Sequence, residues 1–189
     1  MGRIIFDTAA TINGWIADEH DSLSWLFAVP GGETPDESLI PSGAAVMVEG
    51  RTTYEWVLRE SDILAHPEKW QEFHGTRPTF VFTHRELPVP EGADIRFVSG
   101  SVSEALPGIR EAAGEGDIWV VGGGDLAGQF LDAGALDELA ISIAPVTLTG
   151  GAPLFPRRVE SDRLHLEEAT AVGQFARLRY SVSPAEPAS

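Results

Sequence analysis

The chain of 189 residues contains no cysteine, so disulfide bonds, thiolate nucleophiles and zinc–thiolate sites are excluded. Lysine is nearly absent: Lys69 stands beside twelve arginines, and a phosphate-binding cluster would therefore consist of arginine. No apolar run approaches the ~20 residues that span a bilayer, so we expect no contact with a membrane. The N-terminus reaches Asp7 too early for the apolar region of a signal peptide, which makes the cytoplasm the expected location.

The charge balance is strongly acidic, with a formal net charge of −16 at pH 7. Such a surface repels nucleic acid at long range, and we expect no nucleic-acid partner. A small phosphorylated ligand remains compatible, because a few arginines and backbone N–H groups can hold it locally. The length and an apolar content of 43% fit one domain with a core and a ligand cleft. We expect this domain to cover residues 1–182, followed by a disordered tail at 183–189.

Short apolar runs alternate with helical patterns, which indicates an α/β fold whose mostly parallel sheet is covered on both faces. Two strands at the C-terminal end are expected to be antiparallel, so the sheet is mixed. Three segments, 34–37, 52–55 and 101–104, have capping-box spacing at a helix start. The predicted strands cover 4–10, 44–48, 79–83, 95–98, 118–121, 139–144, 164–169 and 175–182, and two further helices cover 67–74 and 126–133.

Three junctions where a predicted strand runs into a helix carry glycine or hydroxyl residues, at 50–53, 99–101 and 122–125. In open α/β sheets ligands lie at the carboxyl ends of the strands, where the free N–H groups of helix N-termini can bind a phosphate. Each junction alone is equally well a tight turn, whereas three together favour a dinucleotide. Gly122, Gly124 and Gly128 give G-x-G-x-x-x-G, which misses the Rossmann spacing by one residue and argues against a Rossmann site.

Two arginines directly follow predicted buried strands. They are Arg51 and Arg85, and His84 lies beside the second. A guanidinium at the carboxyl end of a strand can hold a pyrophosphate or a 2′-phosphate with two hydrogen bonds, and the second case would select NADPH over NADH. The alternative for each arginine is a surface position next to an acid.

Three acids are candidates for proton transfer or substrate binding. Asp7 is a charged residue in an apolar strand, which is costly unless it faces a site or has a partner. Facing a cleft, its pKa should be raised; the alternatives are an arginine partner or exposure at the strand end. Asp36 and Glu37 follow the cleft loop, but for both of them helix capping is the favoured interpretation.

Other chemistry finds little support in the sequence. The five histidines have no metal-ligand spacing, and His66, His74 and His165 are expected at the surface. No serine lies in a G-x-S-x-G context, so hydrolase chemistry is not indicated. Most tryptophans are expected in the core, but Trp15 follows Gly14 in a predicted loop over the site.

The order of several short motifs is more specific than any one of them. The motifs are TINGWIA at 11–17, VMVEGRTTY at 46–54, DIWVVGGG at 117–124, GALDEL at 134–139, IAPV at 143–146 and GGAPLF at 150–155. Together they resemble the dihydrofolate reductase superfamily, and most closely the C-terminal reductase domain of the riboflavin-biosynthesis deaminase/reductase. The resemblance spans nearly the whole chain and implies a three-layer α/β/α fold, NADPH as cofactor and a homodimer.

The resemblance also implies a path for the cofactor. Thr8, Ala9 and Ile16 would line its nicotinamide end under a mobile loop that carries Gly14 and Trp15. The pyrophosphate would lie on the junction after the second strand, and Thr83, His84 and Arg85 would hold the ribose phosphate of the adenosine. A non-proline cis bond is implied between Gly122 and Gly123. The residues expected at the junctions are Gly50, Arg51, Thr52, Thr53, Ser99, Val121, Gly122, Gly123, Gly124, Asp125 and Leu126.

The expected activity is hydride transfer to a small heterocyclic substrate, with a proton supplied by Asp7, an acid near Asp36 or water. Reduction of the ribosylaminouracil intermediate of riboflavin synthesis is the first candidate, and reduction of a pterin, including dihydrofolate, is the second. A non-catalytic NADPH-binding protein is the alternative from another class. Two departures concern the substrate side: Asn13 stands where the riboflavin branch commonly has aspartate, and residues 22–42 lack a known substrate-binding pattern.

Overall fold

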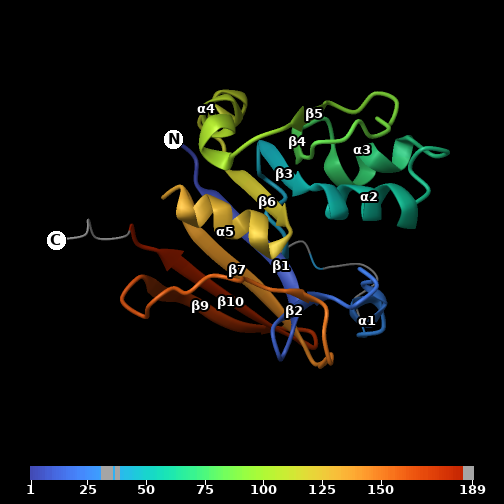
Figure 1. Ribbon diagram of the computed structural model, residues 1–189. Helices are drawn as coiled ribbons and strands as arrows, with labels where there is room; N and C mark the ends of the chain where they lie inside the picture. Colours follow the sequence, from blue (N-terminus) through green and yellow to red (C-terminus); the bar gives the residue numbers. More distant parts are fainter. Residues whose placement is uncertain (31–35, 37–38, 185–189) are drawn as a thin grey trace.

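The computed structural model describes residues 1–30, 36 and 39–184, and its centre is one eight-stranded sheet (Figure 1). Six neighbouring strands run parallel, whereas the last two are antiparallel additions at one edge. The mixed, mostly parallel sheet expected from the sequence is confirmed. In spatial order its strands are β5 (Ile95–Val98), β4 (Thr79–Phe82), β3 (Val46–Gly50), β6 (Ile118–Gly122), β1 (Ile4–Thr11), β7 (Glu138–Ala144), β10 (Phe175–Val182) and β9 (Leu164–Val172).

Helices cover both faces of the sheet and complete the three layers. α4 (Val102–Ala113) and α5 (Gly124–Asp132) pack on the face that carries Phe6 and Val48, and α5 lies across this face in Figure 1. Since side chains alternate along a strand, Asp7 points to the opposite face. That face is covered by α1 (Ser24–Phe27), α2 (Arg51–Glu60) and α3 (Glu68–His74), through apolar clusters around Trp25 and Trp70.

The helix starts follow the sequence prediction at one capping box and depart from it at another. The Ser101 hydroxyl accepts a hydrogen bond from Glu104 N, and Ser101 N donates to Glu104 Oε2 at 2.9 Å, so the box at α4 is confirmed. The box at 52–55 is wrong: α2 begins at Arg51 and Glu55 binds the Arg51 guanidinium instead, at 3.1 Å. The box at 34–37 lies outside the described residues apart from Asp36. α5 begins at Gly124 rather than at Leu126.

A small second sheet replaces the loop predicted around Trp15. Gly14 turns the chain at φ 85°, and its carbonyl accepts a hydrogen bond from Leu154 N at 2.9 Å. β2 (Trp15–Ala17) then pairs antiparallel with β8 (Ala152–Pro153). The prediction of a loop at Trp15 is therefore wrong, because the distant segment after Gly151 supplies the pairing partner that no local pattern reveals.

One histidine predicted at the surface is buried. His74 is 5% exposed, its ring stacks on Trp70 with centroids 3.8 Å apart, and its Nε2 lies 3.1 Å from Glu49 Oε1. Glu49 is fully buried, so the imidazole supplies a polar contact for a carboxyl group that has lost its water. The surface prediction for His74 is wrong, and the contact holds in place the strand residue that precedes Gly50.

Ser183, the first residue beyond the predicted domain limit, makes hydrogen bonds to the domain. Ser183 N donates to Arg163 O at 2.8 Å, and the Ser183 hydroxyl contacts the His165 ring at 3.0 Å. The rest of the predicted tail, residues 185–189, lies outside the described residues.

A buried ion pair connects β1 to β10 across the strand between them. Arg177 donates to Asp7 Oδ1 at 2.7 Å and to Oδ2 at 2.5 Å, and the two residues are 5% and 4% exposed. β7 lies between these strands and carries Ala140 and Ser142 at the intervening positions. These small side chains leave room for the pair, and Ser142 Oγ accepts a further hydrogen bond from Arg177 at 3.1 Å.

Burial controls the titration of this pair. It raises the pKa of Asp7 from 3.8 to about 6, while the hydrogen bonds and charge of Arg177 act in the opposite direction. The folded chain therefore keeps a proton that the unfolded chain loses between about pH 4 and pH 6. The contribution of Asp7 to stability is fully present below about pH 4 and is lost as the pH rises through about 6.

The substitution Arg177→Met should destabilise the fold in a pH-dependent way. It leaves the Asp7 carboxylate buried without its counter-charge, so we expect a loss of about 3–5 kcal/mol in the free energy of unfolding at pH 8. Without Arg177 the pKa of Asp7 rises further, and protonation should make the loss smaller at pH 5. Urea unfolding at the two pH values measures both effects.

Arg158→Met is the matched control, because the Arg158 side chain is 89% exposed and pairs only with Glu160 among the described ion pairs. Its loss should stay below about 1 kcal/mol at both pH values. An Arg177→Met loss that does not change with pH would contradict the assignment of Asp7 as the titrating partner.

Candidate functional site

A cavity of about 750 Å³ opens at the carboxyl ends of the parallel strands, on the sheet face that carries Asp7. It lies where sheets of this class bind ligands, and its volume is typical of ligand pockets. Most residues predicted for the site meet here although they are far apart in the sequence. The predicted residues that line it are Asp7, Thr8, Ala9, Ile16, Gly50, Arg51, Thr52, Thr53, Thr83, His84, Val121, Gly122, Gly123, Gly124, Asp125 and Leu126.

The N-termini of α2 and α5 both open into this cavity, and no side chain caps either of them. Gly50 and Gly123 occupy the two N-cap positions, and glycine has no side chain to bind the free N–H groups of the first turn. The third predicted junction differs, because Ser101 and Glu104 already satisfy the start of α4. The two uncapped helices therefore offer N–H donors and positive dipole ends to an anion in the cavity.

The three consecutive glycines have three separate structural reasons. A Cβ on Gly124 would lie 2.2 Å from Leu154 O, so this glycine lets the backbone approach the segment that follows β8. A Cβ on Gly122 would meet Thr53 Oγ1 at 3.0 Å. A Cβ on Gly123 would meet only Ile16 Cδ1 at 3.9 Å, so the space in front of this residue is open to a ligand. The peptide bond between Gly122 and Gly123 is cis, as the resemblance implies.

The two candidate phosphate-binding arginines are in different situations. Arg51 lines the cavity, but its guanidinium pairs with Glu55. Arg85 is exposed, and among the described residues its guanidinium has no ion-pair partner. Its backbone N–H binds Thr83 Oγ1 at 3.0 Å, which fixes the turn that brings Thr83 and His84 to the cavity wall. The alternative of an ion pair with an acid thus holds for Arg51, whereas Arg85 lies at the surface without such a pair among the described residues.

Of the two acids predicted to act in catalysis, one lies at the cavity. Asp7 contributes to its wall, and both carboxylate oxygens also accept hydrogen bonds from Arg177. Asp36 is exposed and is not among the described residues that line the cavity. Four residues of the predicted cofactor set also do not line the cavity: Gly14, Trp15, Arg85 and Ser99. At the last of these positions the neighbouring Gly100 forms part of the wall.

One part of the wall was not anticipated from the sequence. It is apolar and consists of Leu23, Leu26, Phe27, Leu39, Trp56 and Phe175, which we call the apolar end of the cavity. The residues come from α1, α2, β10 and the segment around Leu39, and the rings of Phe27 and Trp56 stack with centroids 6.1 Å apart. From the sequence alone such apolar residues are predicted to lie in the core, because no local pattern shows that they face a cavity.

The unusual Asn13 has a structural explanation. Its Oδ1 accepts a hydrogen bond from Leu148 N at 3.1 Å, and its Nδ2 donates to Leu148 O at 2.6 Å. Aspartate could accept the first bond but could not donate the second. The amide therefore joins the turn before β2 to the segment that follows β7.

Among residues 1–30, 36 and 39–184, no three histidine, aspartate or glutamate side chains gather in a way that would hold a metal ion. The helices of this part of the chain are also too short or too polar to cross a membrane.

Comparison with known proteins places this geometry among related folds. A family model of the RibD C-terminal domain matches residues 61–176. The uncharacterized protein YwjB of Bacillus subtilis (strain 168) is 26% identical over 179 residues, which are 94% of this chain and 97% of YwjB. A putative riboflavin biosynthesis protein from Shewanella sp. PV-4 superposes with a TM-score of 0.71 at 24% identity, covering 97% of this chain and 99% of the other.

A more distant structure shows the same architecture. Dihydrofolate reductase from Enterococcus faecalis, in a complex that contains NADP(H), superposes with a TM-score of 0.62 at 19% identity, over 95% of this chain and 96% of the other. These similarities establish the fold, and the family model covers more than half of the sequence. The chain belongs to the RibD C-terminal domain family, a reductase-like family with the fold of dihydrofolate reductase.

Proposed function

We propose that this protein is an NADPH-dependent reductase that delivers a hydride to a small heterocyclic substrate. The observation that carries the proposal is the opening of two uncapped helix N-termini into one cavity, beside Thr83 and His84 and within the same wall as Asp7. A dinucleotide phosphate needs such a set of donors, and the nicotinamide would then reach the first strand. The complex of the Enterococcus faecalis relative with NADP(H) supports this choice of cofactor.

The residues present fit this cofactor by their own geometry. The open space in front of Gly123 lets a pyrophosphate approach the backbone, and the first turns of α2 and α5 supply N–H donors. Thr83 and His84 provide polar contacts on the β4 side of the cavity. When bound, NADPH supplies a hydride from C4 of its nicotinamide. The chain itself holds the two reactants together and removes water from the space between them.

Asp7 is the candidate proton donor of the described cavity wall. Its raised pKa brings proton exchange closer to neutral pH than for an exposed aspartate. Arg177 binds both carboxylate oxygens, so the carboxyl group of Asp7 is held in one orientation beside the cavity. Water is the alternative source of the proton.

Two reactions are candidates for the activity. One is reduction of 5-amino-6-(5-phosphoribosylamino)uracil, which the family membership and the Shewanella relative support. The other is reduction of a pterin, which the likeness to dihydrofolate reductase supports. Steady oxidation of NADPH with either compound would distinguish an enzyme from a protein that only binds the cofactor.

Binding of NADPH should depend on the N-terminus of α2. We expect NADPH to quench the tryptophan fluorescence of the wild-type protein, since Trp56 and Trp119 line the cavity. A negative charge in Thr52→Glu favours the helix dipole and should keep the fold stable, but it repels a phosphate and should weaken binding about tenfold or more.

Thr52→Gln is the neutral variant of similar size and should bind NADPH much more tightly than Thr52→Glu. Equal affinities of the two variants would place the phosphates elsewhere. No binding to the wild-type protein at millimolar NADPH would refute the cofactor assignment itself.

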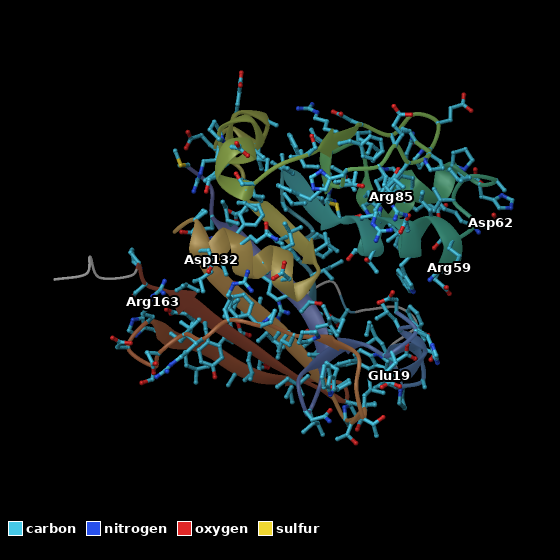
Figure 2. The ribbon with its side chains drawn as sticks, viewed as in Figure 1. Glu19, Arg59, Asp62, Arg85, Asp132 and Arg163 are labelled. Carbon is cyan, nitrogen blue, oxygen red and sulfur yellow. The ribbon has the colours of Figure 1, made fainter. Side chains whose placement is uncertain are left out.

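Arg85 should distinguish NADPH from NADH. If its free guanidinium holds the 2′-phosphate, Arg85→Ala should bind NADPH more weakly, by about tenfold, and NADH unchanged. Arg59→Ala is the control, because Arg59 lies near the other end of α2 and pairs with Glu60 (Figure 2). Equal weakening of both cofactors in Arg85→Ala would reject the 2′-phosphate role.

A further inference from the structure

The apolar end of the cavity consists of two groups of apolar side chains. Leu39 and Phe175 belong to one packed cluster, with Leu23 and Leu26 against it. On the other side, Trp56 of α2 stacks on Phe27 of α1 with an angle of 14° between the ring planes. A ligand in this end would therefore contact side-chain carbon and aromatic faces, which bind flat apolar rings well.

The charges around this end are negative or already paired. Among the described residues of the cavity wall, the cationic candidates are Arg51 and His84, which belong to the junctions after β3 and β4. Arg51 pairs with Glu55. Arg177 lies beneath the wall, and its two terminal nitrogens are bound to Asp7. The charged group of the wall next to Leu23 is Asp21, which is an acid.

The amino-acid sequence around the apolar end also contains more acids than bases. Between Arg3 and Arg51 it has no lysine or arginine and eight acids, of which Asp7 is paired with Arg177 and Glu49 contacts His74. This stretch supplies β1, β2, α1 and the residues around Leu39, and Figure 2 shows Glu19 of this stretch on the side of the molecule where α1 lies. Backbone N–H groups of Ser22 and His20 hold the pKa of Asp18 below its usual value, so this acid stays charged.

A phosphate at the apolar end would lose water without gaining a cation. Desolvation of an unpaired charge against hydrocarbon is costly, and Asp21 in the wall adds repulsion. We infer that the substrate is a neutral, mostly apolar ring compound without a phosphate group. This inference rests on the proposed reductase function and narrows it, since it disfavours the phosphoribosyl candidate and favours an unphosphorylated ring.

The test compares two ligands that share a ring system and differ by one phosphate, 1-naphthol and 1-naphthyl phosphate. Calorimetric titration of the full chain, with and without NADPH, measures both affinities. We expect 1-naphthol to bind at least about tenfold more tightly. Equal or tighter binding of the phosphate ester, or binding of neither ligand, would overturn the inference.

A cation introduced into the wall should change the ratio of the affinities for 1-naphthol and 1-naphthyl phosphate. Leu26 is half-buried in the wall, and the flexible chain of a lysine can keep its ammonium group near water. Leu26→Lys should therefore narrow the preference for 1-naphthol by about fivefold or more, whereas Leu26→Met should keep the wild-type ratio. Thermal unfolding shows whether both variants are folded, and an unchanged ratio in a folded Leu26→Lys protein would contradict the electrostatic explanation.

The experiments distinguish an error in the reductase function from an error in the substrate class. If NADPH does not bind but 1-naphthol is still preferred, the reductase function is wrong and the ligand preference of the apolar end stands. If NADPH binds but the phosphate ester is preferred, the function stands and the substrate class is wrong. With active enzyme, kcat/KM for 5-amino-6-(ribosylamino)uracil should exceed the value for its 5′-phosphate.

Discussion

The parallel alignment of β1, β3, β4 and β6 is the constraint on which the candidate site depends. Parallel strands end at one edge of the sheet, so the segments that follow them must meet there. This brings Gly50 next to Gly122, although 72 residues separate them in the sequence. Two helices then begin at the same place, and their N–H groups and dipoles point into the same cavity. The site is a consequence of strand direction before any side chain is considered.

The Asp7–Arg177 pair explains how a charged residue is kept in the most buried part of this sheet. Replacement of water by a bidentate guanidinium makes the carboxylate tolerable, and small residues on β7 allow the contact across a full strand. The pair also ties the antiparallel β10 to the parallel half of the sheet. Asp7 is therefore part of both the cavity wall and the internal structure, and neither role can be changed without the other.

The sequence predicts the strands and the glycine-bearing junctions between strand and helix well, because both depend on local patterns. Apolar runs of four or five residues mark β3 and β6, and glycine follows the run directly in β6 and after Glu49 in β3. It does not predict β2, since the strand exists only through its pairing with β8. The sequence analysis allows an arginine partner for Asp7 but cannot say which of the twelve arginines it is. The register of β10 against β7 places Arg177 in that position. The homodimer and the cytoplasmic location stay predictions.

The two ends of the cavity also differ in whether they depend on local patterns or on contacts between distant segments. At the glycine junctions, recognition uses backbone N–H groups and helix dipoles, which persist as long as the strand order and the glycines persist. At the apolar end, recognition depends on side chains from α1, α2, β10 and the segment around Leu39, and each can change without harm to the sheet. A family with one cofactor-binding frame can therefore accept different substrates, and the identity of the substrate must be read from the charge and polarity of this end.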